Sequence, residues 1–131
     1  MSEKIKIFII DDDKFLVHMY GMKFEANDFI VESSLSGVEA LEKIRNGFTP
    51  DIILLDLIMP GMDGFDILES IKKESLCKGC LLIMLTNQGL ASDISKAEDR
   101  GVNGYIVKAT TIPSEVVEEV KEFYKQFKMK K

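Results

Sequence analysis

Acidic, hydroxyl and amine side chains stand at four places in the chain where a run of apolar residues ends. In chain order they are Asp11, Asp12 and Asp13, then Asp56, then Thr86, and then Lys108. Carboxylates gathered in one crevice repel each other and resist desolvation, and a hard divalent cation relieves both effects. Magnesium prefers oxygen ligands and keeps some of its waters. If the fold brings these places together, the residue types predict a magnesium site that also holds a phosphoryl group.

The three kinds of side chain complement one another in chemistry on a phosphoryl group. A cation between Asp12 and Asp56, with Asp11 acting through a water molecule, keeps a position open for a phosphate oxygen. Lys108 supplies a positive charge and Thr86 a hydroxyl donor for the same group. A carboxylate is also able to act as a nucleophile and form an aspartyl-phosphate. The metal and the amine then stabilise charge on the group in transfer.

Short apolar runs alternate with longer amphipathic segments along the chain. Apolar runs bounded by turn residues predict strands, at Ile5–Ile10, Phe29–Val31, Ile52–Leu55, Cys80–Leu85 and Tyr105–Val107. Helical spacing or helix-start residues mark the segments between and after them. The first helix is indicated by apolar residues at helical spacing from Leu16 to Phe24, and the second by a capping box, Ser36-Gly-Val-Glu39, with Gly47 at its end. The third is indicated by the capping residue Asp63 ahead of Ile67, the fourth by residues 91–100, and the fifth by Pro113 ahead of Val116.

The alternation of strands and helices predicts a parallel sheet with helices on both faces. Continuous apolar strands agree, because the strands of such a sheet are buried on both sides. We therefore expect an α/β fold, a doubly wound five-stranded parallel sheet of flavodoxin-like order 2-1-3-4-5 with five helices. The ligand site of such a sheet lies outside the carboxyl ends of its strands. Taken singly, Asp13 and Thr86 could cap helices and Lys108 could be solvated, but four strand ends with complementary chemistry favour one site.

The sequence resembles a response-regulator receiver domain over nearly its whole length. The matching segments are Ile9-Ile10-Asp11-Asp12-Asp13, Leu54-Leu55-Asp56-Leu57-Ile58-Met59-Pro60-Gly61-Met62-Asp63-Gly64, Leu85-Thr86 and Gly104-Tyr105-Ile106-Val107-Lys108. The D-x-x-M-P-x-M-D-G stretch is highly specific, and the separations between the segments also fit the family. The resemblance implies one receiver domain over residues 1–131, of the stand-alone type, with no output domain.

The resemblance implies a role for each matching side chain at the acidic end of the sheet. Asp56 is similar to the phosphoacceptor of the family. Asp11 and Asp12 resemble its acidic pair, with Asp12 as the direct ligand of Mg²⁺, and Ile58 matches the position that gives a backbone carbonyl to the metal. The expected function is a phospho-acceptor switch in a two-component phosphorelay.

Three further positions resemble the parts of the family that hold and sense the phosphoryl group. Lys108 resembles the lysine that contacts it, and Thr86 and Tyr105 resemble the switch pair that moves on phosphorylation. Two departures stand beside them. The family usually has a cis proline after the lysine, where this chain has Ala109, so we predict a trans bond there. A small residue usually follows the threonine, where this chain has Asn87.

The expected partners are a sensor histidine kinase or a histidine phosphotransfer protein and a separate downstream protein. The chain is expected to catalyse only its own phosphorylation and dephosphorylation. Lys plus Arg number 17 against 22 Asp plus Glu, a net charge of −5, which argues against nucleic acid as a direct partner. No apolar run is long enough to span a membrane, and no signal-peptide core is present. The expected location is the cytoplasm, without a membrane partner.

Three alternatives are weighed against the switch. A haloacid-dehalogenase-type Mg-dependent phosphatase also uses an aspartate nucleophile, and Asp11-x-Asp13 mimics its opening motif, but that interpretation leaves Asp56 unexplained. A nucleotide or flavin binder would need a Gly/Ser/Thr-rich phosphate-binding loop after the first strand, where this chain has three aspartates that would repel a phosphate. A degenerate receiver that acts only as a docking module would not need the full set of functional side chains.

The two cysteines, Cys77 and Cys80, form a C-x-x-C sequence. A redox motif of this spacing normally opens a helix after a strand, whereas this pair runs into the predicted strand Cys80–Leu85. A structural zinc site needs four ligands, and the chain offers only these thiols and His18. The simpler interpretation is one loop thiol and one buried strand thiol.

Overall fold

The computed structural model describes residues 4–87 and 91–130. In this part of the chain five parallel strands form one sheet with the order β2-β1-β3-β4-β5, as predicted. The strands are β1 (Lys6–Ile10), β2 (Ile30–Ser34), β3 (Ile52–Leu55), β4 (Leu81–Thr86) and β5 (Gly104–Val107). Because all five run in one direction, their carboxyl ends share one edge of the sheet.

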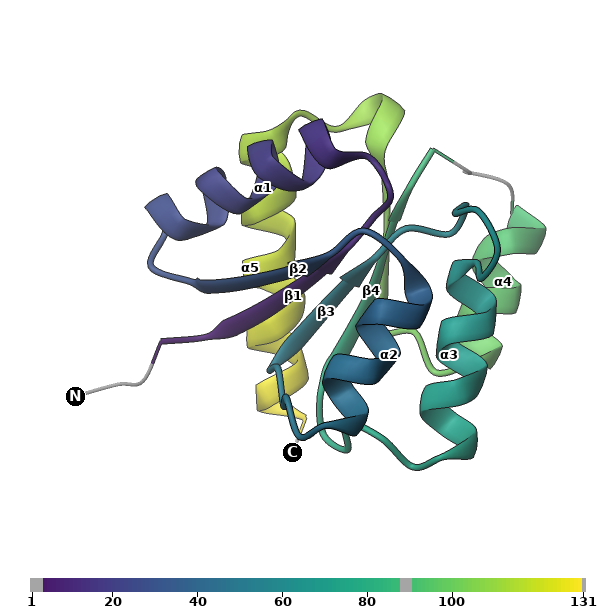
Figure 1. The fold of residues 1–131 in the computed structure, drawn as a ribbon. Helices are drawn as coiled ribbons and strands as arrows, with labels where there is room; N and C mark the ends of the chain where they lie inside the picture. The colour runs from purple at the N-terminus through teal and green to yellow at the C-terminus, as the bar shows by residue number, and fades with distance from the viewer. Residues whose placement is uncertain (1–3, 88–90, 131) are drawn as a thin grey trace.

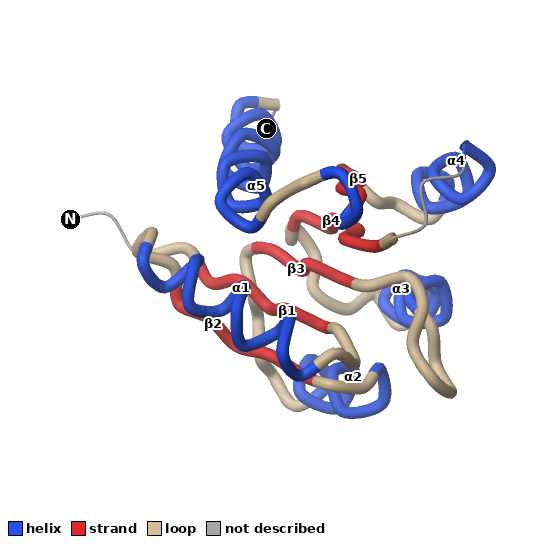
Figure 2. Tube along the Cα trace, turned by 90° about the horizontal axis from the view of Figure 1, so that it is seen from above, coloured by secondary structure: helices blue, strands red, loops and turns tan. Residues whose placement is uncertain are grey.

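Helices follow the strands in turn and cover the sheet on both faces (Figures 1 and 2). They are α1 (Lys14–Ala26), α2 (Gly37–Arg45), α3 (Gly64–Lys73), α4 (Ala91–Asp99), α5 (Pro113–Met129) and a short 3₁₀ turn, η1 (Lys108–Thr110). α1 and α5 lie on one face, and α2, α3 and α4 lie on the other. None of these helices, within the described residues, is both long and apolar enough to cross a membrane.

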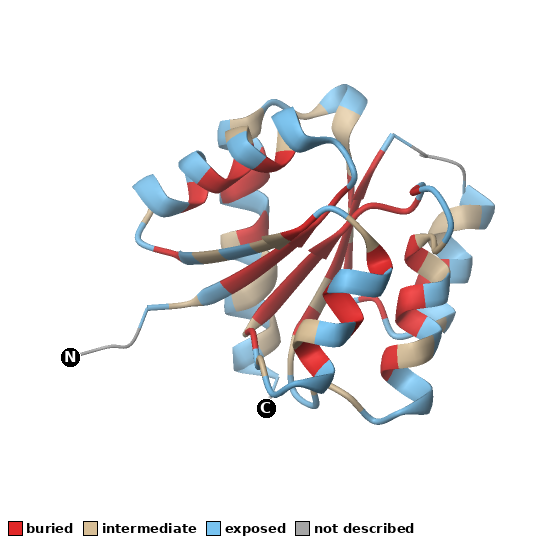
Figure 3. Cartoon of the chain, viewed as in Figure 1, coloured by how far each residue is buried: buried red, intermediate tan, exposed pale blue. Residues whose placement is uncertain are grey.

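Two apolar layers hold the helices to the sheet. In β1 alternate residues serve different layers: Ile7 and Ile9 face α1 and α5, whereas Phe8 and Ile10 face the other three helices. The central strands are therefore buried along almost their whole length, while the outer helix faces are exposed (Figure 3). Burial on both sides explains why β3 is apolar at every position, Ile52 to Leu55.

Side-chain caps fix where three of the helices begin. Asp13, Ser36 and Asp63 each accept a hydrogen bond from a backbone N–H three residues further on, at 3.1, 3.2 and 2.9 Å. Such caps satisfy backbone donors that the first helical turn leaves unpaired. Gly47 has a positive φ of 105° just after α2, and Pro113 is the first residue of α5, both as predicted.

The predicted second strand was placed wrongly. Phe29–Val31 was expected, but β2 is Ile30–Ser34, and Phe29 is buried ahead of it. β2 is an edge strand, so its outer side chains alternate with inner ones and Glu32 is tolerated within it. A search for continuous apolar runs misses such a strand. The fourth strand also begins one residue later than expected and includes Thr86.

Candidate functional site

Parallel pairing brings the four polar strand ends to one place. The last residues of β1 and β3 pair directly, so Asp11 and Asp56 leave the sheet side by side. Thr86 pairs with the last residue of β5, which Lys108 follows. These groups line a cleft of ≈ 300 Å³, with Leu16 also in its wall.

Three carboxylates from two strand ends form an acidic cluster in this cleft. Asp11 and Asp56 are only 3% and 8% exposed, whereas Asp12 is exposed. One carboxylate oxygen from each lies within 4.8 Å of the others. All three donors are hard oxygen ligands, partly open to water, which is the set that Mg²⁺ prefers. The residues present therefore fit the predicted cation.

Lys108 joins the acidic cluster in a way that the sequence did not predict. Its Nζ lies 2.6 Å from Asp11 Oδ2 and 3.6 Å from Asp56 Oδ2. Burial lowers the pKa of Lys108, but the hydrogen bond with Asp11 and the charges of both carboxylates outweigh burial and leave the pKa raised. The side chain is therefore a buried ammonium that already balances part of the negative charge.

Asp56 occupies the least favourable position for a carboxylate in the cluster. Burial raises its pKa first, and the charge of Asp11 raises it further. Lys108, a hydrogen bond from the Thr86 hydroxyl and a backbone N–H from Ile58 oppose the change only in part, so the pKa stays above 3.8. A more basic carboxylate is a better nucleophile, so this environment favours attack by Asp56 on an electrophile.

Asp11 and Asp13 are held by local hydrogen bonds. The backbone N–H of Asp13 donates to Asp11 Oδ1 at 2.9 Å, and Lys108 binds the other oxygen of Asp11. Both oxygens of Asp11 are thus engaged, which is consistent with contact to a metal through water rather than directly. Asp13 caps α1, as its simpler interpretation predicted, and also lines the cleft.

The loop after β3 is folded back on Asp56 by a close approach at Gly64. The Gly64 N–H donates to the carbonyl of Leu57 at 2.8 Å. A Cβ at Gly64 would lie 2.6 Å from the Asp56 carbonyl oxygen and 3.0 Å from Leu57 Cα, so only glycine fits without a backbone shift. Ile58 lies in this loop with its side chain 58% exposed. Its carbonyl as a metal ligand stays a prediction.

The two predicted switch residues lie on neighbouring strands. Thr86 is 1% exposed at the end of β4. Tyr105 on β5 pairs with Met84 of β4 and is half-buried against the helix layer that contains α4. Burial raises the pKa of Tyr105, and the charges of Asp93 on α4 and of Asp56 raise it further. The phenol therefore stands in the electrostatic field of both the cleft and α4.

The bond between Lys108 and Ala109 is trans, as predicted: no peptide bond in the described residues is cis. The chain continues from β5 into η1, Lys108–Thr110, so the residues after the lysine form a 3₁₀ turn. Asn87 is exposed and lines the cleft mouth. Asn87 and Ala109 also line one neighbouring hollow together, with Lys108 shared between it and the cleft.

Tyr20 is a neighbour of the site that the sequence did not single out. It was expected only as part of the apolar stripe of α1, and it is indeed 3% exposed. Burial raises the pKa of its phenol, Lys108 lowers it, and the charges of Asp11 and Asp56 raise it. A tyrosine hydroxyl in an otherwise apolar stripe was the available hint.

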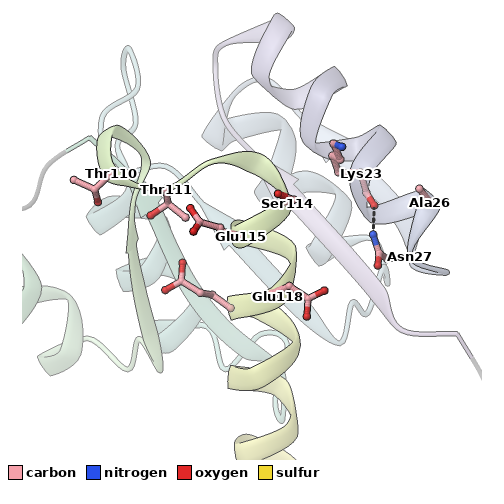
Figure 4. A pocket seen from close by; sticks show the side chains of 9 residues that line it. Lys23, Ala26, Asn27, Thr110, Thr111, Ser114, Glu115 and Glu118 are labelled. Atoms are coloured by element: carbon pink, nitrogen blue, oxygen red, sulfur yellow. Dashed lines mark hydrogen bonds between the residues drawn. The ribbon is translucent and has the colours of Figure 1, made fainter.

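A second and larger hollow of ≈ 720 Å³ lies between the end of α1 and the start of α5 (Figure 4). Its walls carry exposed charged side chains, among them Lys23, Glu115 and Glu118. The hydrogen bond drawn there, from the Asn27 amide to the Lys23 carbonyl at 2.8 Å, belongs to the end of α1. The hollow gathers no buried nucleophile with a partner, so the smaller cleft is the better candidate site.

Comparison with known proteins gives a consistent result. Residues 7–121 match the family model described as the response regulator receiver domain. The chain is 32% identical over 123 residues to the response regulator protein VraR of Staphylococcus saprophyticus, covering 92% of this chain and 56% of that protein. It is 30% identical over 109 residues to the chemotaxis protein CheY of Halobacterium salinarum, covering 83% of this chain and 88% of that one.

Solved structures show the same architecture. A CheY-like receiver domain protein from Methanospirillum hungatei superposes with a TM-score of 0.86 at 26% identity, covering 98% of this chain and 100% of that one. Chemotaxis protein CheY4 of Vibrio cholerae superposes with a TM-score of 0.84 at 24% identity, covering 92% of this chain and 99% of that one. At this identity the likeness shows the fold alone. The chain spans about half the length of the curated relatives VraR and ResD of Bacillus subtilis.

Proposed function

Since the chain belongs to the response regulator receiver domain family of two-component signalling, we propose that it is a switch phosphorylated on Asp56. The donor is a phosphohistidine on a sensor kinase or a histidine phosphotransfer protein. The observation that carries the proposal is the position of Asp56, a buried carboxylate of raised pKa beside Lys108 and Asp11 in an open cleft.

The proposed reaction moves a phosphoryl group from nitrogen to oxygen. An Asp56 carboxylate oxygen attacks the phosphorus, and a P–O bond forms as the P–N bond to the donor imidazole breaks. The electron pair of that bond goes to the imidazole nitrogen. Lys108 stabilises charge on the phosphoryl oxygens, and the Thr86 hydroxyl donates to one of them. Asp56 is the nucleophile because it is the carboxylate that burial and Asp11 make more basic.

The cation of this site is proposed to be Mg²⁺. Asp12 and Asp56 are its direct ligands, Asp11 acts through water, and the Ile58 carbonyl completes the protein's contribution. When bound, the ion supplies positive charge to the phosphoryl oxygens. The cluster of three carboxylate oxygens within 4.8 Å supports this assignment.

The proposed output is a movement of Thr86 and Tyr105. A phosphoryl group on Asp56 attracts the Thr86 hydroxyl, which now bonds to the carboxylate itself. That movement leaves space for Tyr105, half-buried on the next strand, to turn inward. The changed surface comprises α4, β5 and α5, where a downstream protein reads the state. Whether the whole protein is this one domain stays a prediction.

Intact-mass measurement after incubation with acetyl phosphate and magnesium tests the proposal. One phosphoryl group should be added to the wild type and none to Asp56→Asn, because an amide is a poor nucleophile. Asp28→Asn is the matched control: it removes the same charge at an exposed position before β2, and its φ of 67° suits asparagine. Equal labelling of all three proteins would overturn the assignment. No labelling of the wild type would leave the docking-module alternative, whereas turnover of small phosphate esters would favour a phosphatase.

A further inference from the structure

The two cysteines face each other across the turn that leads into β4. Cys77 has a positive φ of 49° and Gly79 one of 82°, and the N–H of Cys80 donates to the Cys77 carbonyl at 3.2 Å. A turn closed in this way holds its first and fourth Cα atoms within about 7 Å. A disulfide spans roughly 4.4–6.8 Å between Cα atoms, so a turn of this kind brings the two cysteines into its range.

The side chains of the pair are in contact. Their thiols form a hydrogen bond that lowers the pKa of Cys77 and raises that of Cys80. Both residues are free thiols of intermediate exposure, and Cys77 Sγ also lies 3.9 Å from the Pro50 carbonyl oxygen. The prediction that Cys80 is a buried strand thiol is therefore wrong, because Cys80 precedes β4, is half-exposed and has a thiol neighbour.

We propose that Cys77 and Cys80 form a reversible intrachain disulfide when the protein meets a peroxide. The thiolate of one cysteine attacks one peroxide oxygen, and hydroxide leaves as the sulfenic acid forms. The sulfur of the other cysteine then attacks the sulfur of the sulfenic acid, so that an S–S bond replaces the S–O bond and water leaves with the proton of the second thiol. For hydrogen peroxide the balance is two thiols and one peroxide to one disulfide and two waters.

The turn keeps the two thiols together whichever of them is oxidised first. The thiolate is the reactive form of cysteine, and a sulfenic acid on either residue has the other sulfur beside it across a turn closed by the hydrogen bond from the Cys80 N–H to the Cys77 carbonyl. The second step is therefore intramolecular.

The site is separate from the cleft of Asp56. Pro50 and Asp51 lie just before β3, and the N–H of Leu81 donates to the Asp51 carbonyl at 2.9 Å. The cysteines therefore lie near the amino ends of β3 and β4, at the opposite edge of the sheet from Asp56. The amino ends of these two strands are at the lower end of the sheet in Figure 1. The disulfide closes only the turn 77–80, so it joins the end of the α3 loop to β4 without changing the cleft.

A tryptic digest tests the proposal directly, because Lys78 lies between the cysteines. The reduced protein is treated with hydrogen peroxide, alkylated with N-ethylmaleimide and digested. We expect the peptide ending at Lys78 and the one beginning at Gly79 to remain joined, without maleimide, and to separate on treatment with dithiothreitol. Two separate peptides, each oxidised or alkylated on its own, would overturn the proposal, as would a link found only between two chains.

Two variants test the two-step route. Cys80→Ser and Cys77→Ser each lack the second thiol, so each should accumulate a sulfenic acid on its remaining cysteine that dimedone traps, whereas the wild type should be labelled several-fold less. Equal dimedone labelling of the wild type and the two variants would contradict the route. Thermal unfolding shows whether each variant is folded. If a variant is not folded, the digest of the wild-type protein still tests whether the disulfide forms.

Discussion

At the scale of single residues, the surroundings of Asp56 on balance oppose its ionisation. Burial and the charge of Asp11 raise its pKa, and the groups around it compensate only in part. The folded state therefore holds a proton on Asp56 at a pH where the unfolded chain has lost it. Between pH 3.8 and the raised pKa of Asp56 in the folded state, the free energy of unfolding falls as the pH rises. Above both pKa values the lost stability stays constant.

Asp56→Asn should therefore raise stability at neutral pH in metal-free buffer. The advantage over the wild type should shrink as the pH falls through the folded pKa of Asp56, and should vanish below 3.8. Thermal unfolding followed by circular dichroism over this window, with EDTA present, measures the difference. A wild type as stable as the variant at neutral pH would contradict the raised pKa.

Asp12→Ala should weaken magnesium binding and yet raise the melting temperature of the metal-free protein by a few degrees. The variant loses one carboxylate from a cluster of three, which removes a ligand and also a repulsion. Titration calorimetry gives the affinity, and Asp99→Ala, an exposed change on α4, is the control for the lost charge. An unchanged magnesium affinity in Asp12→Ala would count against the metal site.

The sequence was sufficient for the residues that end strands, but not for their contacts. Asp11, Asp56, Thr86 and Lys108 could be placed together because parallel strands share an edge. The hydrogen bond of Lys108 to Asp11 could not be predicted, since it depends on side-chain reach across the cleft.

At the scale of elements, the loop from β3 to α3 holds Asp56 through a backbone contact. A Cβ on Gly64 would come within 2.6 Å of the Asp56 carbonyl oxygen. The motif that contains Gly64 was recognised as a sequence pattern, whereas its physical reason appears only in the folded loop. β2 shows the converse: its hydrophobic pattern is weak because it is an edge strand, so its bounds could not be predicted.

Gly64→Ala should lower the free energy of unfolding by about 1–3 kcal/mol, because the backbone around Asp56 must move to admit the methyl group. Phosphorylation by acetyl phosphate should slow with it. Gly21→Ala is the matched control in α1, where the new Cβ would meet only Val31 at 3.6 Å. That change should be neutral or stabilising by about 0.5–1 kcal/mol. Equal stability of the two variants would show that the close approach does not constrain the loop.

At the scale of the whole molecule, the proposed function requires that phosphorylation at the carboxyl ends of the strands alters a surface that another protein reads. A bound group shifts a conformational equilibrium only by preferring one state. Thr86 bonds to Asp56. Tyr105 lies on the adjacent strand β5, where it pairs with Met84 of β4 and stands in the field of Asp93 on α4. These contacts give a short route from the cleft to α4.

Backbone amide shifts on phosphorylation should therefore concentrate in residues 86–110, of which 88–90 lie outside the described residues. Thr86→Ala should leave phosphorylation of Asp56 largely intact while reducing the shifts at Tyr105 and binding of the downstream partner. Heteronuclear NMR of both proteins, with and without acetyl phosphate, measures this. Shifts confined to the first helix, with residues 86–110 unchanged, would contradict the route.

The central claim is that one carboxylate, Asp56, accepts the phosphoryl group. Borohydride reduces an acyl phosphate to a primary alcohol but leaves phosphate esters of hydroxyl groups unchanged. After incubation with acetyl phosphate and magnesium, reduction and digestion, tandem mass spectrometry should find the reduced side chain at Asp56 and at no other carboxylate. A reduced side chain at Asp11 or Asp12, or a phosphate that resists borohydride on Thr86, would contradict the account.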